Sequence, residues 1–324
     1  MAFSMDLAHC ELCPRRCMAD RSVNNSSVDK TAGFCGAPSV PRIARAGLHF
    51  WEEPCISGAG AYADAALPVG CVPKDTRGSG TVFFSHCNLG CCFCQNHDIS
   101  AGGHGKNITV DRLAAIFLEL QDQGAYNLNL VTATPYLPFV LEALEAVRGK
   151  LAIPVVYNTG GYERPEALNA LAPYVDIWLT DLKFFDPALS LKLCGAADYF
   201  TVASAAARQM TELTGAPLFD ENGLLRRGVI VRHLALPGNR ADSKAVLDWL
   251  AAALPPHSFL LSLMSQYTPC YKAKTMPPLH RRISSFEYND VVQHALTLGL
   301  NTGYMQQRSS AKEEYTPPFD LSGV

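Results

Sequence analysis

The stretch GTVFFSHCNLGCCFCQN, residues 80–96, joins a short apolar run to four cysteines within eight positions. The β-branched and aromatic residues at its start predict a buried β-strand entered through a glycine. Cys87, Cys91 and Cys94 follow the strand with the spacing C-x3-C-x2-C, and Cys92 stands among them outside that spacing. We therefore expect the loop after this strand to carry the chemistry of the protein.

The whole chain has 324 residues, of which 48% are hydrophobic and 18% charged, and its formal net charge is -3. This composition is typical of a globular protein and shows no basic bias toward nucleic acid or membrane surfaces. No apolar run reaches the roughly 18 residues of a membrane span, and the first residues lack the features of a signal peptide. We therefore expect a cytoplasmic protein with reduced thiols, in which twelve cysteines indicate metal binding or catalysis rather than disulfides.

Strand-like and helix-like segments alternate along the chain after residue 80. Thr109 can cap a helix with a regular apolar stripe, and Ser284 and Glu287 have the spacing of a capping box. Alternating strands and helices predict an α/β fold with a parallel sheet. A partial barrel of six units is favoured over an open Rossmann-type sheet, because no G-x-G-x-x-G follows the first strand. The expected strands are 80–84, 127–132, 153–161, 175–181, 228–238 and 258–264, and the expected helices are 109–124, 137–148, 164–173, 242–254 and one from Ser284.

Three thiolates on one tight loop suit three corners of a [4Fe–4S] cluster, since iron–sulfur clusters are bound by cysteinate. No fourth cysteine follows at ferredoxin spacing, so one iron is left open to a non-protein ligand. Zinc is the alternative, but a zinc site requires a fourth Cys or His at paired spacing. His86 and His97 are interpreted as hydrogen-bonded loop residues, and Cys92 as a neighbouring thiol without a ligand role. Barrel active sites lie on the loops after the strands, which agrees with a catalytic cluster here.

At these residues the sequence resembles the radical S-adenosylmethionine (radical SAM) superfamily. The resemblance rests on Cys87, Cys91 and Cys94 after the first strand, on the aromatic Phe93, and on six strand–helix units. It implies a partial (β/α)6 TIM-type barrel as the fold. It also implies that the protein is an oxidoreductase that binds a [4Fe–4S] cluster and S-adenosyl-L-methionine. In that superfamily the methionine amino and carboxylate groups chelate the open iron. An electron from the cluster then cleaves the sulfonium bond, and the 5′-deoxyadenosyl radical abstracts hydrogen from the substrate.

A narrower resemblance, over about residues 80–270, is to the pyruvate formate-lyase activating enzymes, which install a glycyl radical on a partner enzyme. CQNHDIS resembles their C-x-N-x-D extension, and LTDLKFF resembles their D-L-K strand end. NTGG and VRHLALPG resemble their D-T-N-G loop and V-R-x-x-x-P-G segment. The resemblance implies an electron donor such as flavodoxin or ferredoxin and a glycyl-radical enzyme as substrate protein. The cofactor-binding residues that it implies are Phe93, Asn96, Asn158, Thr159, Asp181, Lys183 and Arg232.

One loop departs from that family. Its glycine-rich G-G-E loop after the second strand, which holds the methionine amino group, is replaced by TATP at 132–135. Hydroxyls of Thr132 and Thr134 could accept from that ammonium, although the carboxylate is missing. The chain looks most like a branch of activating-enzyme-like proteins that share C-x-L-C-P-R-x-C, EEP-x-I-S-G, Y-N-T-x-G-Y and R-H-L-x-L-P-G. Residues 59–76, rich in Ala, Gly and Pro, are expected to form an inserted surface loop.

Three classes of function remain open. The first is an enzyme that activates a glycyl-radical partner, and the second uses the same chemistry on a peptide, nucleoside or small metabolite. The third is a non-enzymatic iron–sulfur carrier or a zinc-stabilised scaffold. The open three-cysteine site disfavours the third class, because carriers normally use four protein ligands. The sequence does not separate the first two.

A second cysteine group, Cys10-x2-Cys13-x3-Cys17-x17-Cys35, lies near the N-terminus. Two tight spacings and a distant fourth thiol can close around one ion or one cluster, so zinc and a second [4Fe–4S] cluster both remain open. A segment of about 35 residues with few apolar groups cannot form its own core, so metal would supply the ordering free energy. The expected organisation is this Cys-rich segment over 1–50, a linker and insertion over 51–79, a barrel over 80–275, and a C-terminal helix and strand over 276–324.

Overall fold

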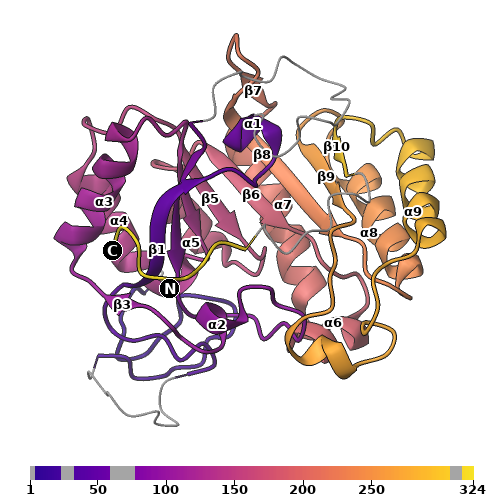
Figure 1. Cartoon of the computed structure of the whole chain (residues 1–324), viewed down its shortest axis with the longest axis horizontal. Coiled ribbons are helices and arrows are strands. Elements are labelled where there is room, and N and C mark those ends of the chain that lie inside the picture. Colours follow the sequence, from indigo (N-terminus) through magenta and orange to yellow (C-terminus); the bar gives the residue numbers. More distant parts are fainter. Residues whose placement is uncertain (1–3, 23–32, 59–76, 307–315) are drawn as a thin grey trace.

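The computed structural model describes residues 4–22, 33–58, 77–306 and 316–324, and in them one mixed sheet forms the centre of the molecule (Figure 1). Six strands run parallel in the order β2-β4-β5-β6-β8-β9. Their order follows the chain, as helical crossovers require, and the expected α/β partial barrel is confirmed. The six strands are β2 (Ser79–Phe84), β4 (Leu128–Val131), β5 (Val155–Thr159), β6 (Ile177–Asp181), β8 (Leu225–Leu234) and β9 (Leu260–Met264).

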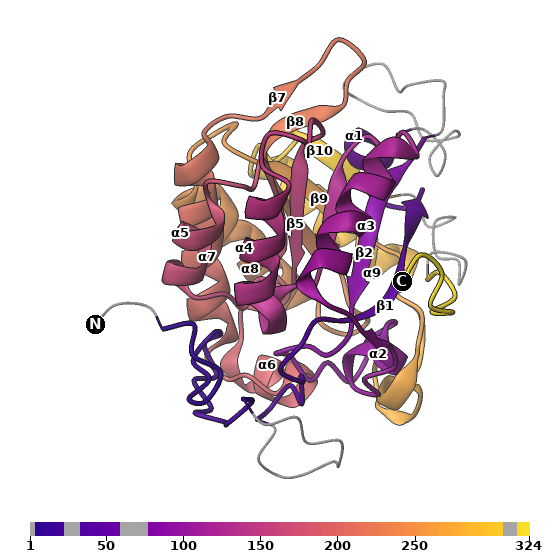
Figure 2. The same ribbon diagram turned by 90° about the vertical axis from the view of Figure 1, so that its left-hand side faces the viewer.

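Helices connect the parallel strands and cover the outer face of the sheet (Figures 1 and 2). The expected caps are present, because the Thr109 hydroxyl accepts from the Arg112 N–H and Ser284 and Glu287 form a reciprocal capping box. The apolar stripe of α3 is buried against the sheet, as its period predicts. The helices are α3 (Val110–Asp122), α4 (Leu137–Ala146), α5 (Pro165–Leu171), α6 (Pro187–Cys194), α7 (Tyr199–Thr214), α8 (Arg240–Ala253) and α9 (Ser285–Thr297).

Helices α6 and α7, which lie between β6 and β8, are absent from the sequence-based expectation. The buried face of α7 consists mostly of small residues, including Ala203, Ala206 and Ala207, with Tyr199 and Met210 as its large members. Small residues give a weak periodic signal although they allow close packing on the strands. The crossover in this unit is therefore longer than the hydrophobic pattern suggests.

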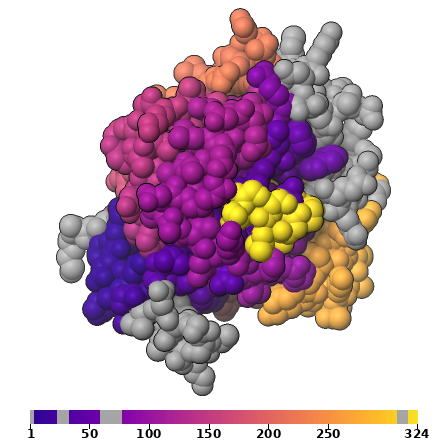
Figure 3. Space-filling view, turned by 60° about the vertical axis from the view of Figure 1, so that its left-hand side comes forward, coloured from indigo at the N-terminus to yellow at the C-terminus, as the bar shows by residue number. Residues whose placement is uncertain are grey.

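Short strands extend the sheet at both edges. β1 (Arg42–His49) pairs antiparallel with β2, and β3 (Lys106–Asn107) pairs with β1. At the other edge β10 (Gly303–Met305) runs parallel to β9, whereas β7 (Leu218–Phe219) lies off this strand order and pairs antiparallel with the start of β8. The C-terminal residues 316–324 lie beside β1, where the Leu321 N–H donates to the Ala44 carbonyl (Figure 3). Because β1 is part of the barrel sheet, residues expected in the Cys-rich segment also contribute to the barrel.

The two ends of the barrel carry different segments (Figures 1 and 2). The short helix α1 (Pro54–Ser57) lies at the amino ends of the parallel strands, and α2 (His97–Ser100) and the N-terminal segment lie at the opposite end. Two 3-10 turns, η2 (Thr134–Tyr136) and η3 (Tyr271–Thr275), follow β4 and β9. The expected insertion at 59–76 lies outside the described residues. In the described ranges, none of the helices is long and apolar enough to cross a membrane.

Candidate active site

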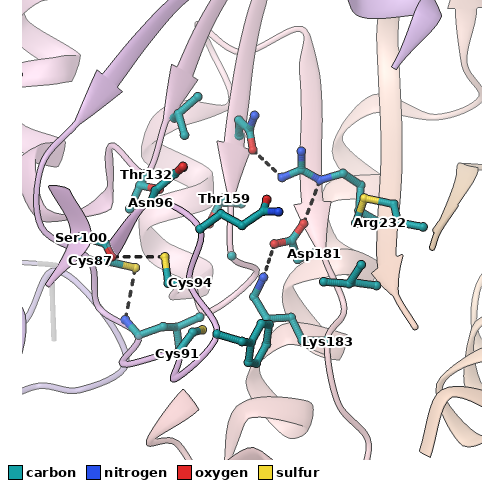
Figure 4. A pocket seen from close by; sticks show the side chains of 18 of the residues that line it. Cys87, Cys91, Cys94, Asn96, Ser100, Thr132, Thr159, Asp181, Lys183 and Arg232 are labelled. Atoms are coloured by element: carbon teal, nitrogen blue, oxygen red, sulfur yellow. Dashed lines mark hydrogen bonds and ion pairs between the residues drawn. The ribbon is translucent and has the colours of Figure 1, made fainter. Parts of the chain in front are cut away.

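A cavity of about 260 Å³ lies at the carboxyl ends of the parallel strands (Figure 4). Cys87, Cys91 and Cys94, called the barrel thiols below, line it from the loop after β2. Tyr267 and Thr268, in the stretch after β9, line it from the other side. Most residues expected to bind cofactor also line the cavity, namely Phe93, Asn96, Thr132, Asn158, Thr159, Asp181, Lys183 and Arg232.

The loop that carries the barrel thiols is anchored to the end of α6. The Gly90 N–H donates to the Cys194 carbonyl (2.9 Å), and the Cys92 N–H donates to the Leu193 carbonyl (2.8 Å). The Cys92 side chain packs in the hydrophobic core and does not line the cavity, as the irregular spacing of this thiol suggests. The loop is thus held from behind while the three spaced thiols face the cavity.

The barrel thiols are half-buried, and this burial shifts their pKa values. Burial raises the pKa of Cys87 to about 12, against a backbone N–H from Leu89 and the charge of Lys183, which both lower it. The pKa of Cys91 is raised well above its ordinary value by the same burial. Burial also raises the pKa of Cys94, whose Sγ lies 3.2 Å from the Ser100 hydroxyl. A metal centre must therefore displace protons from all three thiols, and binding would be coupled to pH.

An ion-pair network lies opposite the thiols. Asp181, at the end of β6, accepts from the Lys183 ammonium and from Nε of Arg232 (2.8 Å). Burial would raise the pKa of Asp181, but the charges of Arg232 and Lys183 outweigh it and lower the pKa below its usual value. Asp181 is therefore ionised, and two cations share it. Arg232 uses three of its five N–H donors within the protein, which leaves donors for a ligand.

Glu52 belongs to this network, although sequence analysis assigned it no role. One carboxylate oxygen accepts from the side-chain amides of Asn129 (3.2 Å) and Asn158 (3.1 Å), and the other lies 3.3 Å from Nη1 of Arg232. Glu52 precedes α1, so it reaches these strands from the amino ends of the barrel. The signal that could have revealed it is a pair of acidic residues in an otherwise apolar stretch, FWEEPCI at 50–56.

Thr134 requires a correction, because it does not line the cavity in which it was expected to hold an ammonium group. The 3-10 turn η2 directs its hydroxyl to Oε1 of Glu163, which also accepts from the Thr159 hydroxyl, both at 2.5 Å. Thr134 instead lines a second cavity, beside the N-terminal cysteines. Asp98 also lies outside the first cavity, where it pairs with His97 on the surface.

The second cavity collects the N-terminal thiols, defined as Cys10, Cys13, Cys17 and Cys35, against the barrel. Burial raises the pKa of Cys13 to about 12, with a further rise from the neighbouring charges of Cys35 and Glu163. In the part of the chain that the structure describes, no group of three or more His, Cys, Asp or Glu side chains is placed to bind a single metal ion. The fold therefore brings both cysteine groups together without closing either around one ion.

Comparison with known proteins identifies the class to which this site belongs. Residues 81–213, which span β2 to α7, match the radical SAM superfamily. Over 309 residues the chain is 28% identical to MJ0674, an uncharacterized protein of Methanocaldococcus jannaschii, with 91% of this chain and 77% of that protein covered.

Two solved structures align with parts of the chain. A domain of a pyruvate-formate lyase-activating enzyme from Bacteroides vulgatus is 17% identical, with 51% of this chain and 88% of that chain covered and a TM-score of 0.38. The FeFe-hydrogenase maturase HydG from Carboxydothermus hydrogenoformans is 13% identical, with 70% and 53% covered and a TM-score of 0.47.

Proposed function

We propose that this radical SAM enzyme activates a partner protein by installing a glycyl radical on it. The observation that carries the proposal is one cavity in which the barrel thiols meet Asn96, Asp181 and Lys183. These residues belong to the C-x-N-x-D and D-L-K motifs, which resemble those of the activating enzymes. These residues come from loops after different strands. Their convergence on one cavity therefore supports the interpretation that both motifs serve the same site.

The residues in this cavity fit the two groups that the superfamily uses. The barrel thiols can hold three irons of a [4Fe–4S] cluster, and the fourth iron can take the methionine end of S-adenosyl-L-methionine. When bound, the cluster supplies the electron that cleaves this cofactor to methionine and a 5′-deoxyadenosyl radical. The methionine end carries an ammonium and a carboxylate, and the network opposite the thiols offers both signs of charge.

The side chains of this protein bind and orient that end of the cofactor. Lys183 and Arg232 can donate to its carboxylate, and an arginine offers the better-defined geometry. Thr132 and Asp181 provide oxygen acceptors for its ammonium group. Because Asp181 is shared with both cations, it holds their donors at fixed positions before the cofactor binds.

An aromatic wall excludes water from the same cavity. Phe93 packs edge-to-face against Phe184, with ring centroids 6.1 Å apart, and against Tyr267, with centroids 6.2 Å apart. These rings come from the cysteine loop, the end of β6 and the stretch after β9. A radical enzyme benefits from such a wall, because closing a site prevents side reactions of a reactive intermediate.

The test has two stages with the anaerobically reconstituted protein. With dithionite and S-adenosyl-L-methionine it should form 5′-deoxyadenosine and methionine. When a glycyl-radical enzyme encoded by the same organism is added, electron paramagnetic resonance should detect a glycyl radical, and an acceptor with Ala in place of its glycine should give none. Cofactor cleavage without a protein radical would contradict the activating role and would direct the search to a peptide, nucleoside or small metabolite.

A further inference from the structure

The N-terminal thiols are gathered by backbone hydrogen bonds into a compact loop. The Cys10 N–H donates to the Ala19 carbonyl (3.0 Å), and the Met18 N–H donates back to the Cys10 carbonyl (3.1 Å). The Arg16 N–H donates to the Cys13 carbonyl (3.1 Å), which forms a tight turn between the second and third cysteines. The sequence-distant Cys35 lines the same cavity as the other three thiols. The fold of the chain alone therefore brings four side chains that can bind metal to one cavity.

Arg21, which also lines this cavity, is a buried cation with only 3% of its surface exposed. Its guanidinium donates to the carbonyls of Ala37 (2.9 Å), Pro38 (2.8 Å) and Pro135 (2.8 Å). Nη1 lies 3.5 Å from Sγ of Cys10. Among the described residues no carboxylate forms an ion pair with Arg21. The contact of Arg21 that could become its counter-ion is the Cys10 thiol, which is an anion once deprotonated.

Arg15 repeats the pattern on another side of the cavity. Its Nε donates to the Asn88 carbonyl (3.0 Å), Nη1 donates to the Gly195 carbonyl (2.6 Å), and the guanidinium stacks over Phe34 at 3.7 Å from the ring centroid. Nη2 is buried without a hydrogen-bond partner. A buried charge without a counter-ion is costly, so buried Arg21 and half-buried Arg15 beside four thiols indicate that the site is completed by an anionic group.

A centre with four thiolates supplies that anion. Four thiolates around a zinc ion, or around an oxidised [4Fe–4S] cluster, leave a net charge of about -2. Either centre would therefore match the two arginines. The location of the cavity distinguishes between them.

The cavity directly adjoins the loop of the barrel thiols. Asn88 lines it, while Cys87, the preceding residue, lines the cavity of the barrel thiols. The Cys35 carbonyl lies 3.0 Å from Nδ1 of His86, so one hydrogen bond and one peptide link join the two cysteine groups. A structural zinc site gains nothing from this closeness, whereas an electron relay depends on it.

We propose that the N-terminal thiols bind a second [4Fe–4S] cluster, which passes one electron to the cluster at the barrel thiols. An external protein that donates one electron reduces the second cluster from the 2+ to the 1+ state. The second cluster returns to 2+ when it transfers that electron to the first, and no atoms move. The four thiols must turn toward a common centre on binding, since no three of the described Cys, His, Asp and Glu side chains now converge on one ion. The relay rests on the function proposed above, but occupancy of the site does not.

Metal analysis of anaerobically reconstituted full-length protein tests occupancy. Wild type should hold about eight irons and eight sulfides per chain and no zinc, and C10A/C13A about four of each. The double variant C55A/C92A, which removes two buried cysteines outside both groups, should retain about eight irons. The first double variant could disturb the fold of the segment, so a single variant is also needed. Cys17 is the exposed member of the group, so Cys17→Ala disturbs the packing least, and this variant should also lose iron. About four irons in wild type, with or without one zinc, would overturn the proposal.

The relay is tested by changing the electron donor. With a reduced flavodoxin as donor, Cys17→Ala should cleave S-adenosyl-L-methionine about tenfold more slowly than wild type. With dithionite, which reaches the first cluster directly, the two proteins should differ by less than about twofold. Equal rates with flavodoxin would overturn the relay. If wild type cleaves nothing with either donor, the proposed function fails, and the iron count still decides whether the second cluster exists.

Discussion

The N-terminal thiols lie beside the loop that carries the barrel thiols, yet the protein compensates the charges around the two cysteine groups in different ways. Beside the barrel thiols, Lys183 and Arg232 are paired with the carboxylates of Asp181 and Glu52. Beside the N-terminal thiols, buried Arg21 donates only to carbonyls and a thiol. The cations and carboxylates of the first site nearly balance, so this site suits a zwitterionic ligand group that carries both an ammonium and a carboxylate. The second holds positive charge that an anionic centre would complete.

The largest expected effect is the loss of catalysis when a barrel thiol is removed. Cys87→Ala, Cys91→Ala and Cys94→Ala should each abolish formation of 5′-deoxyadenosine, because each removes one of three cluster ligands on a loop with no spare ligand in place. Cys92→Ala should retain activity, since its side chain packs in the core. The amount of 5′-deoxyadenosine formed under dithionite measures both outcomes. Turnover in any of the first three variants would contradict the ligand assignment.

The barrel half of this comparison was predictable from sequence because its signals are local. The spacing of the barrel thiols, the strand that precedes them, and the position of Asp181 and Lys183 at a strand end all occur within short segments. The resemblance of the D-L-K and V-R-x-x-x-P-G segments then led to Arg232. Parallel strands place their carboxyl ends at one edge, so the strand order was sufficient to bring these residues together.

The remaining features could not be predicted, because their meaning depends on contacts between distant residues. Glu52 meets Arg232 across 180 positions, and Arg21 meets Pro135 across 114. Thr134 was misplaced because the 3-10 turn η2 points its hydroxyl at Glu163, which no local pattern reveals. Charge compensation is a property of the folded protein, and the sequence shows only the charges.

The second prediction tests compensation at the barrel site. Glu52→Ala should lower the free energy of unfolding by about 3–5 kcal/mol, because it removes one of the two carboxylate partners of Arg232 and the acceptor of two side-chain amides. Thermal or denaturant unfolding of the two proteins side by side measures the loss. Glu142→Ala removes an exposed carboxylate and should change stability by less than about 0.5 kcal/mol. A Glu52 variant as stable as this control would show that Arg232 needs no such partner.

The third prediction concerns Glu163, which accepts a hydrogen bond from one threonine of each cavity, Thr159 in the first and Thr134 in the second. Burial, against hydrogen bonds from Thr134 and Thr159 that lower it, raises the pKa of Glu163 from 4.5 to about 7. The folded state therefore holds this proton more tightly than the unfolded state. The stability gained is fully present below pH 4.5 and is lost as the pH rises through about 7, by about 3 kcal/mol in total.

Glu163→Gln isolates that contribution, because the amide stays neutral and its oxygen can still accept from both hydroxyls. The midpoint of thermal unfolding should fall between pH 5 and pH 8 by more in wild type than in Glu163→Gln. Glu142→Gln, at an exposed position, should follow wild type. Identical pH profiles for wild type and Glu163→Gln would mean that the Glu163 carboxylate is already ionised across this range.

The smallest expected effect is on cofactor affinity at Arg232. Its guanidinium lines the cavity and retains donors beyond those engaged by Asp181, Glu52 and Asn158. A hydrogen bond to a charged group contributes roughly 1.5–3 kcal/mol, so Arg232→Ala should raise the dissociation constant of S-adenosyl-L-methionine about ten- to a hundredfold. Arg226→Ala removes an exposed arginine of the same strand and should leave the constant unchanged. Titration of the reconstituted proteins, with circular dichroism as a check on folding, measures both constants. If the two variants bind the cofactor equally well, Arg232 serves only to compensate Asp181 and Glu52, and Lys183 is left as the cation that receives the carboxylate.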